Sequence, residues 1–187
     1  MKYAFCLLAL LAISACNNPG QQNAAPVYYD VAGYVKAQID ALAKTKPTVQ
    51  KRARMGQNTE QLTTQTINWP RELELFSQAD INKPALRTSY AIARPDSLTY
   101  LYTLKPSEKN LTVRRLQVQL DSATRQPRRI EATLTTENPL YTSERQILLE
   151  SGSTGRQGWS VRHYQVRGYQ HLAVSDKNTF EVEGTVQ

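Results

Sequence analysis

The sequence predicts an α+β fold, with an N-terminal amphipathic helix and a short second helix packed on a large, curved, antiparallel β-sheet. Between residues 27 and 42, apolar residues recur at spacings of three and four, as on one stripe of a helix. From Leu86 onward, apolar and β-branched residues instead alternate with polar ones, and turn-forming clusters separate the segments. Consecutive strands joined by short connections are expected to pair antiparallel in one sheet.

The segment between these two regions supplies a hairpin and the second helix. The first helix is expected to end before Pro47, where the apolar period changes to two. Residues 49–67 then form a hairpin that turns at Gly56. Asn68 is a suitable N-cap for the short second helix, which is expected to end near Asp80.

In the strand-rich region, the alternation changes phase at Arg114 and Arg115, which indicates a β-bulge. Turns are expected at residues 121–127 and 152–158. No long polar or low-complexity stretch interrupts residues 27–187, and about 160 residues is an ordinary size for one domain. We therefore expect a single α+β domain over residues 27–187.

The first residues have the three parts of an export signal: a charge at Lys2, an apolar run over residues 4–12, and small residues before Cys16. The run is too short to span a membrane, which takes roughly 20 apolar residues. The sequence Ile-Ser-Ala-Cys at residues 13–16 resembles the lipobox of bacterial lipoproteins. The resemblance implies that residues 1–15 are a signal peptide that is removed. It also implies that Cys16 carries a diacylglyceryl thioether and an acyl chain such as palmitate on its new amino group.

This resemblance predicts the location of the protein. Two or more acyl chains anchor a protein stably, so lipid on Cys16 would hold it at a membrane. We expect residues 16–26 to form a flexible tether and the protein to be an extracytoplasmic lipoprotein of the bacterial cell envelope, at the outer membrane. The alternative is a secreted protein in which Cys16 is incidental. Ile13 argues against it, because ordinary signal peptidase prefers a small residue there.

The mature chain would have a net charge of +6 and a single cysteine, so no internal disulfide can form. A curled sheet with a helix across its opening can leave a cavity. By its order of elements, the mature domain resembles half-barrel folds of envelope proteins that carry lipids or lipoproteins. The resemblance implies non-catalytic binding of an apolar or amphipathic ligand and no cofactor. The side chains expected to contact this ligand are Tyr100, Tyr102, Leu116, Val118 and Ile130. The alternative is that they only fill a core.

Several arginines fall in one expected hairpin and offer a second mode of binding. On a shared face they would attract lipid phosphates, envelope glycans or an acidic envelope protein. The alternative is a solvated face that discourages association between sheet edges. Nucleic acid is not an expected partner of an extracytoplasmic protein. The second functional hypothesis is therefore an interaction or accessory subunit of an envelope complex, docked through a sheet edge or this basic face. The arginines are Arg114, Arg115, Arg125, Arg128 and Arg129.

The residues available for catalysis or metal binding are few. His163 and His171 lie eight residues apart, and neither belongs to a motif with a nucleophile. Glu181 and Glu183 are two residues apart on an expected strand, roughly 7 Å, which would suit a two-carboxylate hydrolase of envelope polymers. A solvated strand face explains this spacing more simply. No catalytic residue, metal site or cofactor is therefore assigned.

Two short sequences resemble the O-glycosylation sequon of some bacteria with two membranes. They are Asp96-Ser97-Leu98 and Asp121-Ser122-Ala123, which make Ser97 and Ser122 candidate acceptors. The alternative is that Asp-Ser is selected at both places because it favours a turn.

Overall fold

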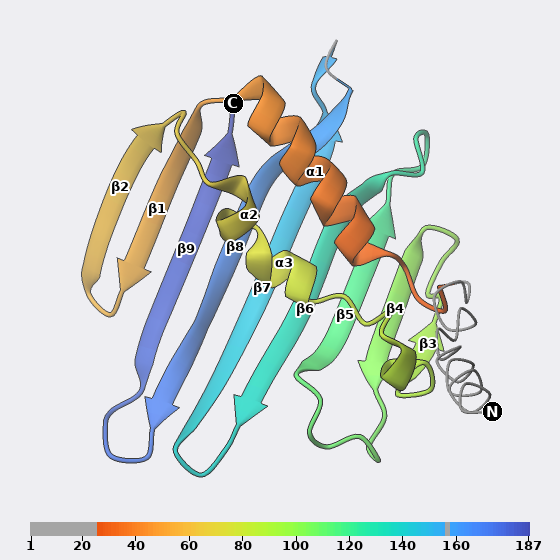
Figure 1. Ribbon diagram of the computed structural model, residues 1–187, viewed down its shortest axis with the longest axis vertical. Helices are drawn as coiled ribbons and strands as arrows, with labels where there is room; N and C mark the ends of the chain where they lie inside the picture. The colour runs from red at the N-terminus through yellow and green to blue at the C-terminus, as the bar shows by residue number, and fades with distance from the viewer. Residues whose placement is uncertain (1–25, 156–157) are drawn as a thin grey trace, which may run out of the picture.

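A computed structural model describes residues 26–155 and 158–187, which contain one open, nine-stranded antiparallel sheet with helices on one of its faces (Figure 1). The sheet order is β2-β1-β9-β8-β7-β6-β5-β4-β3, so the first hairpin joins the last strand and β2 and β3 are the edges. The predicted α+β class and antiparallel pairing are confirmed. The strands are β1 Val49–Met55, β2 Asn58–Thr64, β3 Tyr90–Ala93, β4 Thr99–Leu104, β5 Val113–Leu120, β6 Pro127–Glu137, β7 Tyr141–Ser153, β8 Trp159–Leu172 and β9 Asn178–Val186.

The first helix, α1, spans Val31–Thr45. Asp30 caps it by accepting a hydrogen bond from the Gly33 N–H at 2.8 Å. Lys46 ends it in a left-handed conformation, with φ 47°, before the expected limit at Pro47. The start differs from the prediction: Val27 precedes the helix, because the Asp30 cap sets the first turn.

The predicted second helix is divided into two short helices, α2 Trp69–Glu72 and α3 Glu74–Gln78. Asn68 caps α2 as expected, since its Oδ1 accepts a hydrogen bond from the Arg71 N–H at 3.1 Å. The break falls at Leu73, whose ψ of 12° leaves the helical range while its side chain is fully buried. A 3-10 turn at Pro84–Leu86 leads into β3.

A polar contact fastens α2 to the sheet. Glu72 accepts a hydrogen bond from the Tyr164 hydroxyl at 2.7 Å and pairs with Lys51 at 2.8 Å. Burial, followed by the hydrogen bond to Glu72, raises the pKa of Tyr164. The Tyr164 ring lies over Gly184 of β9, where a Cβ atom would collide with it. A glycine at 184 therefore lets the tyrosine reach the helix.

Bulges alter which residues face the helices. The expected bulge is confirmed by a shift in the β5–β6 register between Val113 and Arg115. Two further shifts, between Gln119 and Leu120 on the β5–β6 ladder and between Glu150 and Ser151 on the β7–β8 ladder, were not predicted. The shift on the β7–β8 ladder lets Val161 and Tyr164, three residues apart on β8, both be buried.

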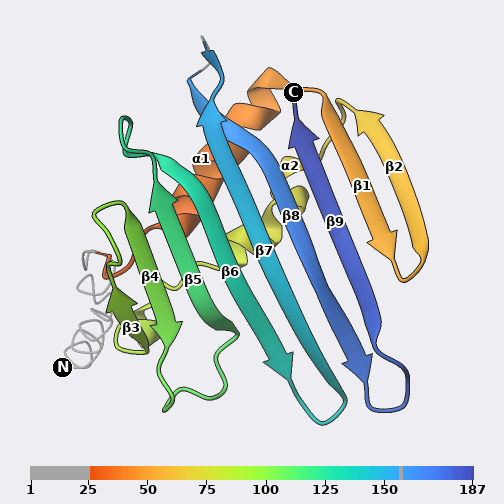
Figure 2. The ribbon, with the colours of Figure 1, turned by 180° about the vertical axis from the view of Figure 1, so that it is seen from behind.

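We call the face that carries the helices the inner face and the opposite one the outer face (Figure 2). The core lies between the helices and the inner face. One side of it is closed by tyrosines: the Tyr28 ring meets those of Tyr90 and Tyr102 edge-on, with centroids 5.7 and 5.3 Å apart. The Tyr102 hydroxyl accepts a hydrogen bond from the Tyr29 N–H at 2.9 Å. These contacts fix the chain before α1 against β3 and β4.

Candidate functional site

The residues predicted to contact a ligand do lie together on the inner face. Tyr100 pairs with Val118, which pairs with Ile130, and Tyr102 pairs with Leu116. Their surroundings are those of a packed core, because all but Tyr100 are exposed by 1% or less. Ligand contact by these residues stays a prediction.

The inner face extends beyond the helices on the β1, β2 and β9 side. We call this part the open strip, because Met55 and Leu62 are 71% and 60% exposed on it. Met55 pairs with Phe180, and Ala53 pairs with Val182, so apolar side chains from neighbouring strands meet there. The alternation of Ala53 and Met55 with arginines was visible in the sequence. The sequence did not show which face of these strands a helix covers. The open strip consists of Ala53, Met55, Leu62, Phe180 and Val182.

Exposed aliphatic residues also occur at two neighbouring hairpins, in their loops and at the end of β8, at one end of the sheet. The β6–β7 and β8–β9 loops lie side by side at the lower end of Figure 1, and the Ala173 N–H donates to the Leu140 carbonyl at 3.0 Å. Leu140, Leu172 and Val174 are 75%, 41% and 95% exposed. This end of the sheet therefore presents apolar side chains to its surroundings.

The outer face is polar, with side chains aligned in register rows across the strands. One row contains Arg52, Glu183, Gln165, Leu148, Glu131 and Gln117. The next contains Arg54, Glu181, Arg167, Gln146, Thr133 and Arg115. Residues directly opposite in a ladder are close enough to interact, so the second row can form a continuous chain of polar contacts, whereas Leu148 interrupts the first.

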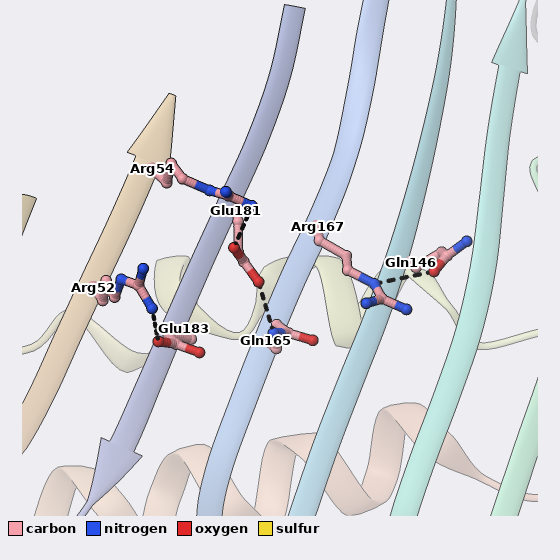
Figure 3. A network of polar contacts seen from close by, with 7 residues as sticks. All are labelled: Arg52, Arg54, Gln146, Gln165, Arg167, Glu181 and Glu183. Carbon is pink, nitrogen blue, oxygen red and sulfur yellow. Dashed lines mark hydrogen bonds and ion pairs between the residues drawn. The ribbon is translucent and has the colours of Figure 1, made fainter. Parts of the chain in front are cut away.

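Ion pairs occupy the β1–β9 side of this face (Figure 3). Arg52 pairs with Glu183 at 3.4 Å, and Arg54 pairs with Glu181 at 2.8 Å. Glu181 also accepts a hydrogen bond from the Gln165 amide at 3.0 Å. These carboxylates are thereby compensated by neighbouring cations.

A hollow of about 400 Å³, which we call the outer hollow, lies over β5 to β8. Arg115 donates to the Gln117 side-chain oxygen at 2.8 Å, and Arg167 donates to that of Gln146 at 3.1 Å. Neither arginine forms an ion pair within residues 26–155 and 158–187. The lining of the outer hollow includes Arg115, Gln117, Thr133, Gln146, Gln165 and Arg167, together with Arg129 and Glu131.

The arginines expected as one basic cluster have separate roles. Arg114, at the bulge, donates to the Lys109 carbonyl at 2.7 Å. Arg125 occupies the β5–β6 turn with φ 59°. Arg129 is paired with Glu131 and Glu150 at 2.8 and 2.6 Å. Of the expected cluster, Arg115 and Arg129 line the outer hollow, and between these two only Arg115 lacks a carboxylate partner in the described part of the chain.

The residues considered for catalysis do not form one site. His163 and His171 lie about 26 Å apart along β8 at the usual rise per residue. Glu181 and Glu183 share the outer face as expected, and each is paired with an arginine. No group of three or more His, Cys, Asp or Glu residues that could hold a metal occurs in the described part of the chain.

The two sequon-like sites are exposed turns. Asp96 accepts a hydrogen bond from the Leu98 N–H at 2.7 Å, and Asp121 accepts one from the Thr124 N–H at 2.8 Å. These backbone hydrogen bonds lower the pKa of both carboxyls. The aspartates therefore build the turns, and modification of Ser97 or Ser122 stays a prediction.

The expected signal peptide, Cys16 and the tether up to residue 25 lie outside the described residues. Among the described helices, none has the length and hydropathy of a membrane span. Comparison with protein-family models, curated proteins and solved structures gives no match. We therefore infer function from the two faces of the sheet.

Proposed function

We propose that this protein is a lipid-anchored protein of the bacterial cell envelope that binds an amphipathic ligand on the open strip without catalysis. One observation carries the proposal: apolar side chains stay uncovered on the inner face beside the helices, with Met55 and Leu62 71% and 60% exposed and the polar residues Asn58 and Glu60 of β2 next to them. Leaving apolar surface in water costs about 25 cal/mol per Å². A contiguous patch of such surface is typical of a binding site.

The polar surroundings of the open strip support a ligand with one apolar and one polar part. The Lys51–Glu72 ion pair bounds the strip on the side of α2. At the end of the sheet, Leu140 and Val174 expose further apolar side chains on the hairpin loops. An acyl chain would lie along the strip, and its head group would remain in solvent. In this proposal the sheet is a half-barrel, with the helices across part of its opening.

Lipid on Cys16 would bring this surface close to its ligands. Fully extended, the residues between Cys16 and Pro26 reach at most about 35 Å. A domain held within that distance of a bilayer can bring the loops of Leu140 and Val174 to the lipid surface.

The ligand is tested with a matched pair of variants on β2. Leu62→Glu places a charge on the open strip, whereas Gln61→Glu places the same charge on the outer face of the same strand. We expect Leu62→Glu to weaken binding of a fluorescent long-chain fatty acid by at least about tenfold, because a charged carboxylate would then lie where the acyl chain has to displace water. Gln61→Glu should bind as the parent does. Equal binding by both variants, or none by the parent, would contradict the proposal.

The anchor is tested separately. Cys16→Ser should yield a protein that is neither cleaved before residue 16 nor labelled by radioactive palmitate in bacteria. Labelling at the level of the parent protein would show that lipid is attached elsewhere or that the lipobox resemblance misleads.

An accessory role in an envelope complex is the second candidate, and the edges of the sheet favour it. β2 is an edge strand whose residues are almost all exposed, and Ile92 on the opposite edge strand, β3, is 52% exposed. An exposed edge can pair with a strand from a partner. Photocrosslinking from residue 61 in living cells distinguishes the two: a single protein adduct supports a complex, and its absence together with bound fatty acid supports the ligand.

A further inference from the structure

We propose that the outer hollow binds an acidic glycan. The acidic groups of the glycan would contact Arg115 and Arg167, and its hydroxyl groups would contact the glutamines between them. This site lies on the opposite face from the open strip, so it does not depend on the ligand proposed above.

The hollow follows from the lengths of the side chains in one register row. Thr133 on β6 lies between the longer Gln146 and Arg115 of the neighbouring strands. Arg167 continues the row on β8. A short side chain flanked by long ones leaves a depression, and residues of the next row, among them Gln117 and Gln165, line it as well.

The charges within the hollow favour an anion. Outside the hollow, Arg52 and Arg54 have carboxylate partners at 3.4 and 2.8 Å, and within its lining Arg129 is paired with Glu131 at 2.8 Å. Arg115 and Arg167 bond only to neutral amide oxygens among their described contacts. A guanidinium has five N–H donors, so one such bond leaves most of its donors free for a ligand.

The separation of Arg115 and Arg167 within their register row favours an extended ligand with several acidic groups. Arg115 and Arg167 stand on strands three spacings apart, about 14 Å between backbones. Their hydrogen bonds hold the Arg115 guanidinium at Gln117 of β5 and the Arg167 guanidinium at Gln146 of β7, two strand spacings or about 10 Å apart. Successive units of a linear polymer span this distance better than a single small anion does. The glutamine amides both donate and accept hydrogen bonds, which suits hydroxyl groups. Arginine further favours planar carboxylates, which it can bind through two parallel hydrogen bonds.

The experiment measures binding of oligogalacturonate, a linear carboxylated glycan, to the mature protein by calorimetry, with neutral dextran oligomers as the comparison. We expect oligogalacturonate alone to bind, with an affinity that falls as salt rises. The double variant Arg115→Gln/Arg167→Gln should bind at least about tenfold more weakly. Arg52→Gln/Arg54→Gln is the matched control, because it removes two cations from the same face outside the hollow, and it should change affinity by less than about twofold.

A steric variant separates the hollow from general charge attraction. Thr133→Tyr fills the depression without changing the net charge, and tyrosine is a good strand residue. It should weaken binding by at least about tenfold while the circular dichroism spectrum and melting temperature stay close to those of the parent. The proposal fails if the parent does not bind oligogalacturonate, if Arg52→Gln/Arg54→Gln weakens binding as much as Arg115→Gln/Arg167→Gln, or if Thr133→Tyr binds like the parent.

Discussion

On β9, Phe180 and Val182 belong to the inner face, and Glu181 and Glu183 belong to the outer face. The same strand thus contributes to an apolar surface on one side and to an ion-paired surface on the other. On the inner face the fold depends on burial under the helices, whereas on the outer face the side chains remain in contact with water. This difference predicts how perturbations of the two faces should differ in their effect on stability.

The largest effect should come from alkaline pH, which acts on several tyrosines of the inner side at once. Burial raises the pKa of Tyr29, Tyr34 and Tyr90 to about 12, and raises that of Tyr164 as well. In the unfolded chain these phenols ionise near pH 10, so the folded state retains protons that the unfolded state loses. Stability should be fully present below about pH 10 and fall as pH rises towards 12.

Urea unfolding at a series of pH values, with phenolate absorbance recorded in parallel, measures this loss. A free energy of unfolding that stays constant while the buried tyrosines ionise would contradict it.

Truncation of the core should rank next. Leu116→Ala removes a fully buried side chain from the inner face and should lower the free energy of unfolding by about 2–5 kcal/mol. Gln117→Ala, at the adjacent outer-face position, should change it by less than about 0.5 kcal/mol. Similar losses in both variants would mean that the faces do not differ as the burial of their side chains indicates. Urea titration provides both values.

A smaller loss is expected at Gly184. A methyl group there collides with the Tyr164 ring, so Gly184→Ala should lower the free energy of unfolding by about 1–3 kcal/mol and loosen the contact to Glu72. Thr185→Ala, the exposed neighbour on the outer face, is the control and should be close to neutral. Thermal melts suffice for this comparison. A stabilised Gly184→Ala protein would show that the ring moves without cost.

The smallest effect belongs to the outer ion pairs. Glu181→Gln removes the carboxylate partner of Arg54 but keeps the shape of the side chain. The expected loss is below about 1 kcal/mol and should shrink further in high salt, because Arg54 is half-exposed. A loss of several kcal/mol would place a main determinant of stability on the outer face.

Much of the fold could be predicted from sequence, because its signals are local. The Asn68 cap, the bulge beside Arg114 and the opposite facing of Phe180 and Glu181 follow from capping preference and strand periodicity. The break at Leu73 could not be predicted, since it arises where the helix must place that side chain in the core.

The candidate sites were less predictable. Tyr102 and Leu116 fit a ligand-lining pattern and a core pattern equally well, because periodicity gives the face of a strand but not what covers it. Arg115 and Arg167 are 52 positions apart in the sequence, and their common row depends on the register of three successive strand pairs.

The sequence by itself determined the fold class, most strand and turn positions, and which residues of each strand share a face, because capping, turn formation and alternation act over a few residues. Only the tertiary structure decided which part of the inner face the helices cover and which polar residues meet on the outer face. Both depend on contacts between segments far apart in the chain, where side-chain packing selects one arrangement among many that local preferences allow.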